Sequence, residues 1–243
     1  MEAGGPLIAP PVGVLGLFGE AFEFVFQGRE AATGGVMVGG LDQVLELAGK
    51  QLEVTLLALL VSLVLALPVG VFLGHYGRGE FVAVSAGNAG RAIPELALIA
   101  LMAAAVGVGL FNLVVALAIL GIPPILTNAF VGIRQVDRVS VEAARGMGMT
   151  DGEIITKVEL PLAVPTIMGG VRTSAINIIA TATIAPLAGI LTLGDFIISR
   201  NVYGDAGVLA GAILVALMAL ALELTLAGVQ WKLTSPGLKI QRS

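Results

Sequence analysis

Residues 136–161 read VDRVSVEAARGMGMTDGEIITKVELP and form the longest polar interval of an otherwise apolar chain. The interval carries these charged side chains: Asp137, Arg138, Glu142, Arg145, Asp151, Glu153, Lys157 and Glu159. Each of them would cost roughly 3 kcal/mol at the centre of a lipid bilayer. We therefore expect residues 135–163 to be a loop that projects into water between two membrane spans.

The same interval contains helix start and stop signals. Asp137 stands where its side chain can cap a first short helix, and Gly146 and Gly148 supply the backbone freedom that ends it. The T-x-x-E spacing of Thr150 and Glu153 is typical of a capping box. This spacing predicts a second short helix, which the proline at position 161 should end.

The composition of the chain is that of a membrane protein. Hydrophobic residues make up 57% of the sequence and charged residues 12%, and the mean hydropathy is +0.99. A soluble fold is excluded by such a composition. The net charge of −4 and the dispersed 13 lysines and arginines give no indication of nucleic-acid binding. With 243 residues, the chain has room for one membrane domain and little else.

The sequence offers little material for catalysis. It has no cysteine and a single histidine, and its apolar segments hold no paired carboxylates. It also lacks the G-x-x-x-x-G-K-[ST] motif that would bind the phosphates of ATP. We expect no catalytic residue, no metal and no cofactor on this chain, and a membrane enzyme or receptor-like scaffold is a remote alternative.

We divide the chain into an N-terminal segment, residues 1–50, and a membrane domain, residues 51–243. Residues 6–27 are apolar and about long enough for an extra span, although an interfacial helix is the alternative. Residues 33–40 are predicted to be a glycine-rich hinge, and residues 41–52 a short amphipathic helix.

Five core spans are expected in an all-α membrane domain. Their ranges are 54–72, 81–106, 110–132, 164–193 and 206–229, and a polar tail follows them. Pro68 should bend the first span, while Gly70 and Gly74 should let a neighbouring helix approach closely. His75 at the far end of this span is expected to be an ordinary interfacial residue, so we assign it no role.

Two groups of polar residues inside the spans are candidates for a solute path. Arg91 and Glu95 would share a helix face if the helix persists across Pro94, although they could equally form a structural tie. Thr173, Asn177 and Thr181 follow one another at intervals of four, which places them on one stripe of the fourth span. The alternative for this stripe is that its hydroxyls bond to their own helix and that the asparagine joins two helices.

The distribution of positive charge predicts the orientation. With the polar loop in the cytoplasm, the following residues fall on or near that side: Arg78, Arg91, Arg134, Arg138, Arg145, Lys157, Arg172, Lys232, Lys239 and Arg242. The opposite side receives Arg29, Lys50 and Arg200. We expect a multi-pass protein of the cell membrane with the loop and the C-terminus in the cytoplasm.

The loop also resembles a known motif. Glu142, Ala143 and Ala144 are followed by Gly148 and then by Leu160 and Pro161, with Val158 where the motif has isoleucine. This pattern is similar to the E-A-A motif of permease subunits of ATP-binding-cassette (ABC) importers. The alternative is an ordinary loop with capped helices.

The resemblance implies a type I ABC importer permease fold and a set of partners. In that family the loop is the coupling element that contacts the ATPase. The implied partners are a second permease subunit, identical or related, two ATPase subunits that bind ATP and Mg, an extracytoplasmic solute-binding protein, and membrane lipid.

Further motifs resemble the osmoprotectant branch, whose solutes include glycine betaine, choline, carnitine and proline betaine. The matching stretches are residues 91–94 (RAIP), 122–126 (IPPIL), 142–150 (EAARGMGMT), 158–161 (VELP) and 170–173 (GVRT). Residues 188–195 and Pro186 depart from the usual pattern of this branch. An importer for an amino acid, methionine or an oxyanion is the alternative, and Arg91 and Arg172 keep an anion path open.

Overall fold

The computed structural model describes residues 14–234, apart from the side chains of Val14, Val82, Val84, Ala86, Ala89 and Arg91. Its α-helices are α1 (Val14–Phe26), α2 (Leu41–Tyr76), α3 (Glu80–Ala92), α4 (Glu95–Val106), α5 (Leu110–Arg134), α6 (Arg138–Gly146), α7 (Asp151–Ile154), α8 (Leu160–Thr181), α9 (Gly194–Ile198) and α10 (Arg200–Leu233). The other elements are the strands β1 (Gly28–Glu30) and β2 (Met37–Gly39), the π-helix η1 (Ile155–Glu159) and the 3₁₀-helix η2 (Ala182–Ala188).

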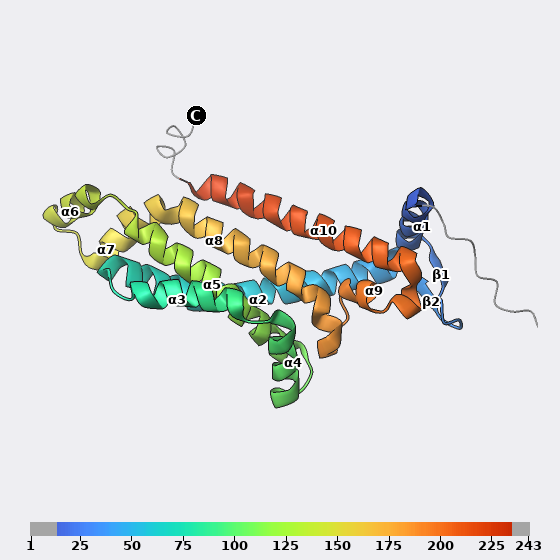
Figure 1. Ribbon diagram of the computed structural model, residues 1–243. Coiled ribbons are helices and arrows are strands. Elements are labelled where there is room, and N and C mark those ends of the chain that lie inside the picture. The colour runs from blue at the N-terminus through green and yellow to red at the C-terminus, as the bar shows by residue number, and fades with distance from the viewer. Residues whose placement is uncertain (1–13, 235–243) are drawn as a thin grey trace, which may run out of the picture.

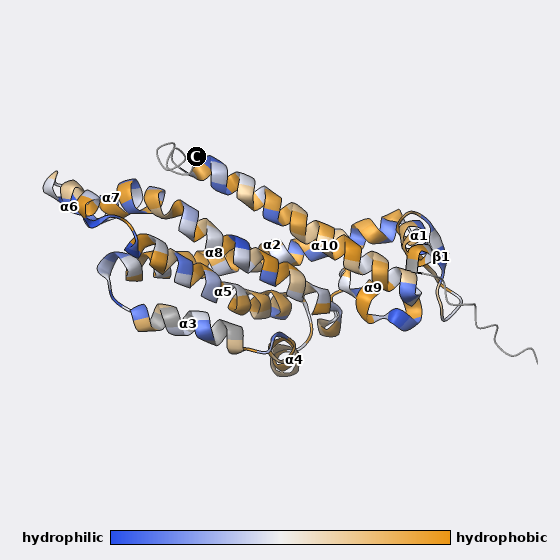
Figure 2. Cartoon of the chain, turned by 45° about the horizontal axis from the view of Figure 1, so that its top comes forward, coloured by the Kyte–Doolittle hydropathy of each residue, from blue (hydrophilic) through white to orange (hydrophobic). Residues whose placement is uncertain are grey.

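The long helices α2, α5, α8 and α10 form an elongated bundle (Figure 1). We call the end with α6 and α7 the loop end and the end with α1, β1 and β2 the hairpin end. Four segments are long and apolar enough to cross a membrane: Leu41–Tyr76, Leu110–Arg134, Asp151–Ala188 and Arg200–Leu233. Hydrophobic residues dominate along these helices (Figure 2). The predicted all-α membrane fold is confirmed, with four of the five expected core spans present as long helices.

The second expected span, residues 81–106, is not one helix. It is divided into α3 and α4 at Ile93 and Pro94, and α4 points away from the bundle (Figure 1). Proline lacks an N–H and disfavours helical geometry in the residue before it, so the helix stops there. Arg91 is in α3 and Glu95 in α4, so the expected shared helix face is absent. The side chain of Arg91 lies outside the described part.

The first span is longer than expected. The predicted amphipathic helix over residues 41–52 and the predicted span over residues 54–72 are one helix, α2, so the expected division at residue 50 falls inside it. Two polar residues buried in α2 have hydrogen-bond partners: Gln51 donates to the carbonyl of Ile179 on α8, and Thr55 donates to the carbonyl of Gln51. The expected hinge, residues 33–40, belongs to the antiparallel β1–β2 hairpin.

The helix after the polar loop also continues further than predicted. It runs through α7, η1 and α8 without stopping at Pro161, which occupies the first turn of α8. The wider turn of η1, in which Leu160 N–H bonds to the carbonyl of Ile155, lies directly before the proline. We attribute the continuity to this turn, because a π turn relieves the clash between a proline ring and the carbonyl of the preceding helical turn.

At the hairpin end, α1 lies across the bundle rather than along it (Figure 1). Its Phe24 packs edge-on against Phe196 and Tyr203, with ring centroids 5.1 and 6.2 Å away, in a small second core. The described helix has 13 residues, about 20 Å, which is short for a span. The predicted extra span over residues 6–27 lies partly outside the described residues and stays a prediction.

The main core forms where α2, α5 and α8 pack against one another. A Cβ atom at Gly70 would lie 2.7 Å from Ala129 Cβ, and one at Gly74 would lie 2.8 Å from Ile133 Cβ. Such distances are far inside van der Waals contact, so both positions need glycine. The predicted close approach at Gly70 and Gly74 is confirmed, with α5 as the neighbour.

We predict that Gly70→Ala destabilises the protein by about 1–3 kcal/mol, because the added methyl group overpacks the contact between α2 and α5. Gly49→Ala on the same helix is the matched control, since nothing lies within 4 Å of a Cβ atom there. The control should leave stability unchanged or raise it slightly. Thermal unfolding of the purified protein in detergent measures both variants, and equal melting temperatures would contradict the packing argument.

Candidate functional site

The first helix of the polar loop is built as the sequence predicts. Asp137 Oδ1 accepts a hydrogen bond from the backbone N–H of Val139, 3.2 Å away, and so caps α6. Gly148 has a φ angle of 85°, and its N–H bonds to the carbonyl of Arg145. The chain therefore needs glycine at position 148 to reverse after α6, because other residues rarely adopt this conformation.

The second helix begins with the predicted capping box. Thr150 Oγ1 accepts from the N–H of Glu153, and the Glu153 carboxylate accepts from the N–H of Thr150. Lys157 Nζ lies 2.7 Å from Glu153 Oε1. The hydrogen bonds from Lys157 and from Thr150 lower the pKa of Glu153 to about 2, so this carboxylate is charged at neutral pH.

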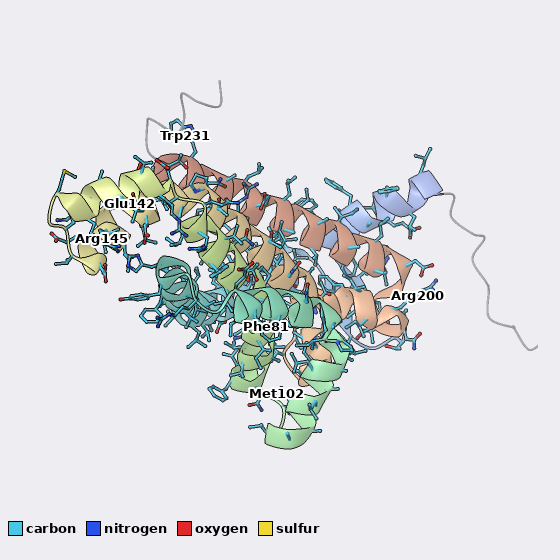
Figure 3. All side chains as sticks on the ribbon, turned by 60° about the vertical axis from the view of Figure 1, so that its left-hand side comes forward. Phe81, Met102, Glu142, Arg145, Arg200 and Trp231 are labelled. Carbon is cyan, nitrogen blue, oxygen red and sulfur yellow. The ribbon has the colours of Figure 1, made fainter. Side chains whose placement is uncertain are left out.

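The outward surface of α6 offers a contact area at the loop end. Val139 and Met147 are 71% and 72% exposed, and Ala143 lies between them at intervals of four, so the three form one apolar stripe. Glu142 is exposed beside this stripe, and Figure 3 shows it on α6 with Arg145. Ala144, by contrast, is buried.

The two remaining motif residues have a different place. Leu160 and Pro161 are partly buried at the start of α8, where Leu160 packs against the main core. The predicted coupling residues therefore have three kinds of place. Glu142, Ala143 and Gly148 are exposed on α6 and its turn, Ala144 on α6 is buried, and Leu160 and Pro161 anchor the loop to a membrane span.

The side chain of His75 is buried at the loop end. Its side chain is 3% exposed, and its Nδ1 lies 2.7 Å from Glu159 Oε2. From the sequence we assigned no role to His75 and did not predict this contact. The two residues are 84 positions apart, so no local sequence pattern could have revealed the contact.

A cavity of about 360 Å³ lies among α3, α4, α5 and α8. Its lining residues are Gly87, Ile93, Glu95, Leu120, Pro123, Pro124, Thr127, Asn128, Thr173 and Asn177. Three of the predicted path residues, Glu95, Thr173 and Asn177, thus meet at one cavity. Thr181 is not one of these lining residues, but its hydroxyl donates a hydrogen bond to Glu95 Oε2 at 2.7 Å.

The lining of the cavity combines one carboxylate with dipoles. Among the lining residues that the structure describes, Glu95 is the only ionisable one. Pro123 and Pro124 lack N–H groups, so the carbonyls one turn earlier on α5 lose their helical partners. Thr173 Oγ1 bonds to the carbonyl of Gly169, as the alternative interpretation of the polar stripe foresaw.

Arg172 does not line this cavity. Its guanidinium hydrogen-bonds Glu223 Oε1 and donates to Gln230 Oε1, and both partners are on α10. The charge of Arg172 is therefore engaged in a tie between α8 and α10. Within residues 14–234, no group of three or more histidine, cysteine, aspartate or glutamate side chains could hold a metal ion.

The chain resembles a known protein family and individual members of it. Residues 66–237 match the family described as binding-protein-dependent transport system inner membrane component. A glycine betaine/carnitine/choline transport system permease protein of Bacillus subtilis (strain 168) is 36% identical over 79% of this chain and 88% of its own length. A carnitine transport permease protein of Listeria monocytogenes is 35% identical over 79% and 89%.

Solved structures agree with the fold. The methionine ABC transporter MetNI, in an inward-facing conformation, has a chain that superposes with a TM-score of 0.71 at 22% identity, covering 80% of this chain and 98% of its own. An amino acid ABC transporter crystallised with histidines gives a TM-score of 0.62 at 22% identity, covering 79% and 94%. The predicted type I ABC importer permease fold is confirmed.

Members of this family move a solute across the membrane and are not enzymes, because a separate ATPase subunit hydrolyses ATP. The exposed α6 helix with its E-A-A residues, the four long apolar helices and the matched relatives agree on one assignment. The chain belongs to the binding-protein-dependent transport system inner membrane components, the permease subunits of ABC importers.

Proposed function

We propose that this permease subunit carries a quaternary ammonium compatible solute into the cell, such as glycine betaine, choline, carnitine or proline betaine. Relatives named for glycine betaine, carnitine or choline are 31–36% identical to the chain. The observation in the structure that carries the proposal is the cavity that brings Glu95, Thr173 and Asn177 together.

The chemistry of the cavity suits such a solute. A quaternary ammonium group has no N–H to donate, so it is attracted by negative charge and by dipoles rather than by directed hydrogen bonds. Glu95 supplies the charge, and the polar side chains of Asn128 and Asn177 supply dipoles. No aromatic residue is among the described lining residues, so the cavity lacks the aromatic cage that binds such cations tightly. Weak binding suits a site that must release its solute.

The charge of the cavity also bears on the alternative solutes. An oxyanion would be repelled by Glu95, and Arg172 is engaged by Glu223 and Gln230 on α10. An amino acid or methionine path receives no support from the two superposed transporters, because a likeness at 22% identity concerns the fold alone. The osmoprotectant solutes are therefore the ones we favour.

We further propose that the loop end faces the cytoplasm and that α6 docks on an ATPase subunit. Trp231, near the end of α10, lies toward the same end as Glu142 (Figure 3), so the loop and the C-terminus would share that side. The complex would contain a second permease subunit, identical or related, two ATPase subunits that bind ATP and Mg, and an extracytoplasmic solute-binding protein. The exposed apolar stripe Val139, Ala143 and Met147 would seat in a groove of the ATPase, with Glu142 accepting hydrogen bonds from a basic residue.

The substrate is tested by uptake into vesicles that hold this chain with its neighbouring permease, ATPase and binding-protein subunits. We expect ATP-dependent accumulation of labelled glycine betaine or choline and no accumulation of molybdate. Accumulation of molybdate alone, or of none of the three, would contradict the proposed solute class while leaving the family assignment intact.

We expect Glu142→Lys and Gly148→Trp to uncouple ATP hydrolysis from uptake while the subunit still inserts. The lysine reverses the charge offered to the ATPase, and tryptophan is strained at a φ angle of 85° and enlarges the docking surface. Uptake should fall at least about tenfold. Gly146→Ala is the matched control, since this glycine has open space around it and no positive φ angle. Normal uptake by both variants would rule out the coupling role.

We expect Glu95→Gln to raise the KM for choline by about tenfold, because the variant removes the one described charge of the cavity. Glycine betaine should be affected less, since its own carboxylate is also repelled by Glu95. Thr181→Val should also raise the KM for choline, because Glu95 loses the hydrogen bond that holds its carboxylate in place. Thr183→Val is the control, because the hydroxyl of Thr183 bonds to the carbonyl of Ala180. Unchanged choline kinetics in Glu95→Gln would exclude this cavity as the path.

A further inference from the structure

The imidazole of His75 on α2 contacts both ends of the segment from α7 to η1. On one side, His75 Nδ1 lies 2.7 Å from Glu159 Oε2 at the end of η1. On the other side, His75 Nε2 lies 3.6 Å from Asp151 Oδ1 at the start of α7. The side chains of His75 and Glu159 are 3% and 6% exposed, so water does not screen their contact. The segment from α7 to η1 therefore contacts α2 at both of its ends, closely at the buried Glu159 and more loosely at the half-exposed Asp151.

The segment from α7 to η1 is the support of α6. α6 packs on α7 and on η1, and Arg145 Nη2 lies 3.3 Å from Asp151 Oδ1. A hollow of about 120 Å³ is lined by Glu142 and Arg145 from α6, His75 from α2 and Glu159 from η1. A force applied to the outer surface of α6 therefore reaches the buried pair through directly contacting residues.

The π turn determines which residue meets His75. In η1 the helix closes through a hydrogen bond from Leu160 N–H to the carbonyl of Ile155, five residues back. One extra residue in a turn rotates the preceding part of a helix by roughly 100° relative to the part that follows. The π turn thus sets the direction in which α7 and α6 leave α8, and Glu159 at its end faces α2.

Beyond the pair, α2 is joined tightly to the rest of the bundle. Gly74, the residue before His75, lets α2 touch Ile133 and the carbonyl of Phe130 on α5. Gly70 makes the same kind of contact one turn earlier. Since packed cores transmit displacement instead of absorbing it, a movement of α2 at His75 carries α5 with it.

We infer that the His75–Glu159 pair is a positioning contact through which the polar loop moves α2, and with it α5, when the ATPase displaces α6. The loop is continuous in the chain with α5 before it and with α8 after it, but not with α2, so without the pair it would lose this buried contact with α2. The inference rests on the proposed coupling role of the loop and is independent of which osmoprotectant is carried.

The first test measures solute accumulated per ATP hydrolysed by the full complex in vesicles. Glu159→Leu and His75→Ala should each lower this ratio by about tenfold, and the double variant should be no worse than either single one. Glu159→Gln, which keeps an acceptor oxygen for His75, should restore most of the ratio. A lower amount of assembled complex would reduce uptake and hydrolysis together, so the ratio separates coupling from stability.

Lys50→Ala is the matched control for this test. Lys50 also lies on α2 and contacts a carboxylate, Glu53, at 2.8 Å, but both side chains are more than 40% exposed. This variant should leave the ratio unchanged, as exposed ion pairs contribute little. A normal ratio in Glu159→Leu and His75→Ala, or equal losses in all variants including Lys50→Ala, would overturn the inference.

The second test needs no solute. The chain has no cysteine, so Arg78→Cys places a single exposed thiol in this subunit, just after α2. Its rate of labelling by a fluorescent maleimide should change at least about twofold when ATP binds to the complex. Adding Glu159→Leu should abolish this change. An ATP-dependent change that persists with Glu159→Leu would overturn the inference, whatever the uptake assay says of the proposed solute.

Discussion

The cost of placing charge in hydrocarbon is the constraint on which the rest of this structure depends. Each charged side chain at the bilayer centre costs roughly 3 kcal/mol, so the charges of residues 136–161 must gather outside the membrane. Two charges that lie deep within the long helices are paired with each other, Arg172 on α8 and Glu223 on α10. The same constraint explains why the polar loop is rich in capping interactions: its short helices cannot draw stability from burial in lipid.

The packing of α2, α5 and α8 follows from a second property of the membrane. Lipid tails are as apolar as leucine, so helices gain little from hiding apolar surface and associate through close contact. Glycines therefore stand at the crossing points: Gly70 and Gly74 face α5, and a Cβ atom at Gly170 would lie 2.6 Å from Asn128 Cβ. This close contact makes the three helices a unit that displaces as a whole.

Local chemistry could be predicted from the sequence, and long-range contacts could not. The Asp137 cap and the Thr150–Glu153 capping box depend on residues two or three positions apart, and both are present as predicted. The stripe of Thr173, Asn177 and Thr181 was also recognisable by its spacing. The contacts of His75 with Glu159 and of Arg172 with Glu223 join residues 84 and 51 positions apart, and no periodicity reveals such pairs. The continuation of the helix through Pro161 was missed because a π turn has no sequence pattern.

The continuous helix from α7 to α8 connects the two ends of the mechanism. Thr173 and Asn177 stand 12 and 16 residues after Pro161, so the cavity lies about 18–24 Å along this helix from the anchor of the polar loop. A helix of this length is stiff, and a tilt at the loop end therefore displaces the cavity lining on α8. If α8 moved alone, it would slide past α5, against which it is closely packed at Gly170. Transport that keeps the core intact thus requires α2 and α5 to follow. The chain itself joins the loop to α5 and α8 but not to α2, which explains why a separate contact between the loop and α2 is needed.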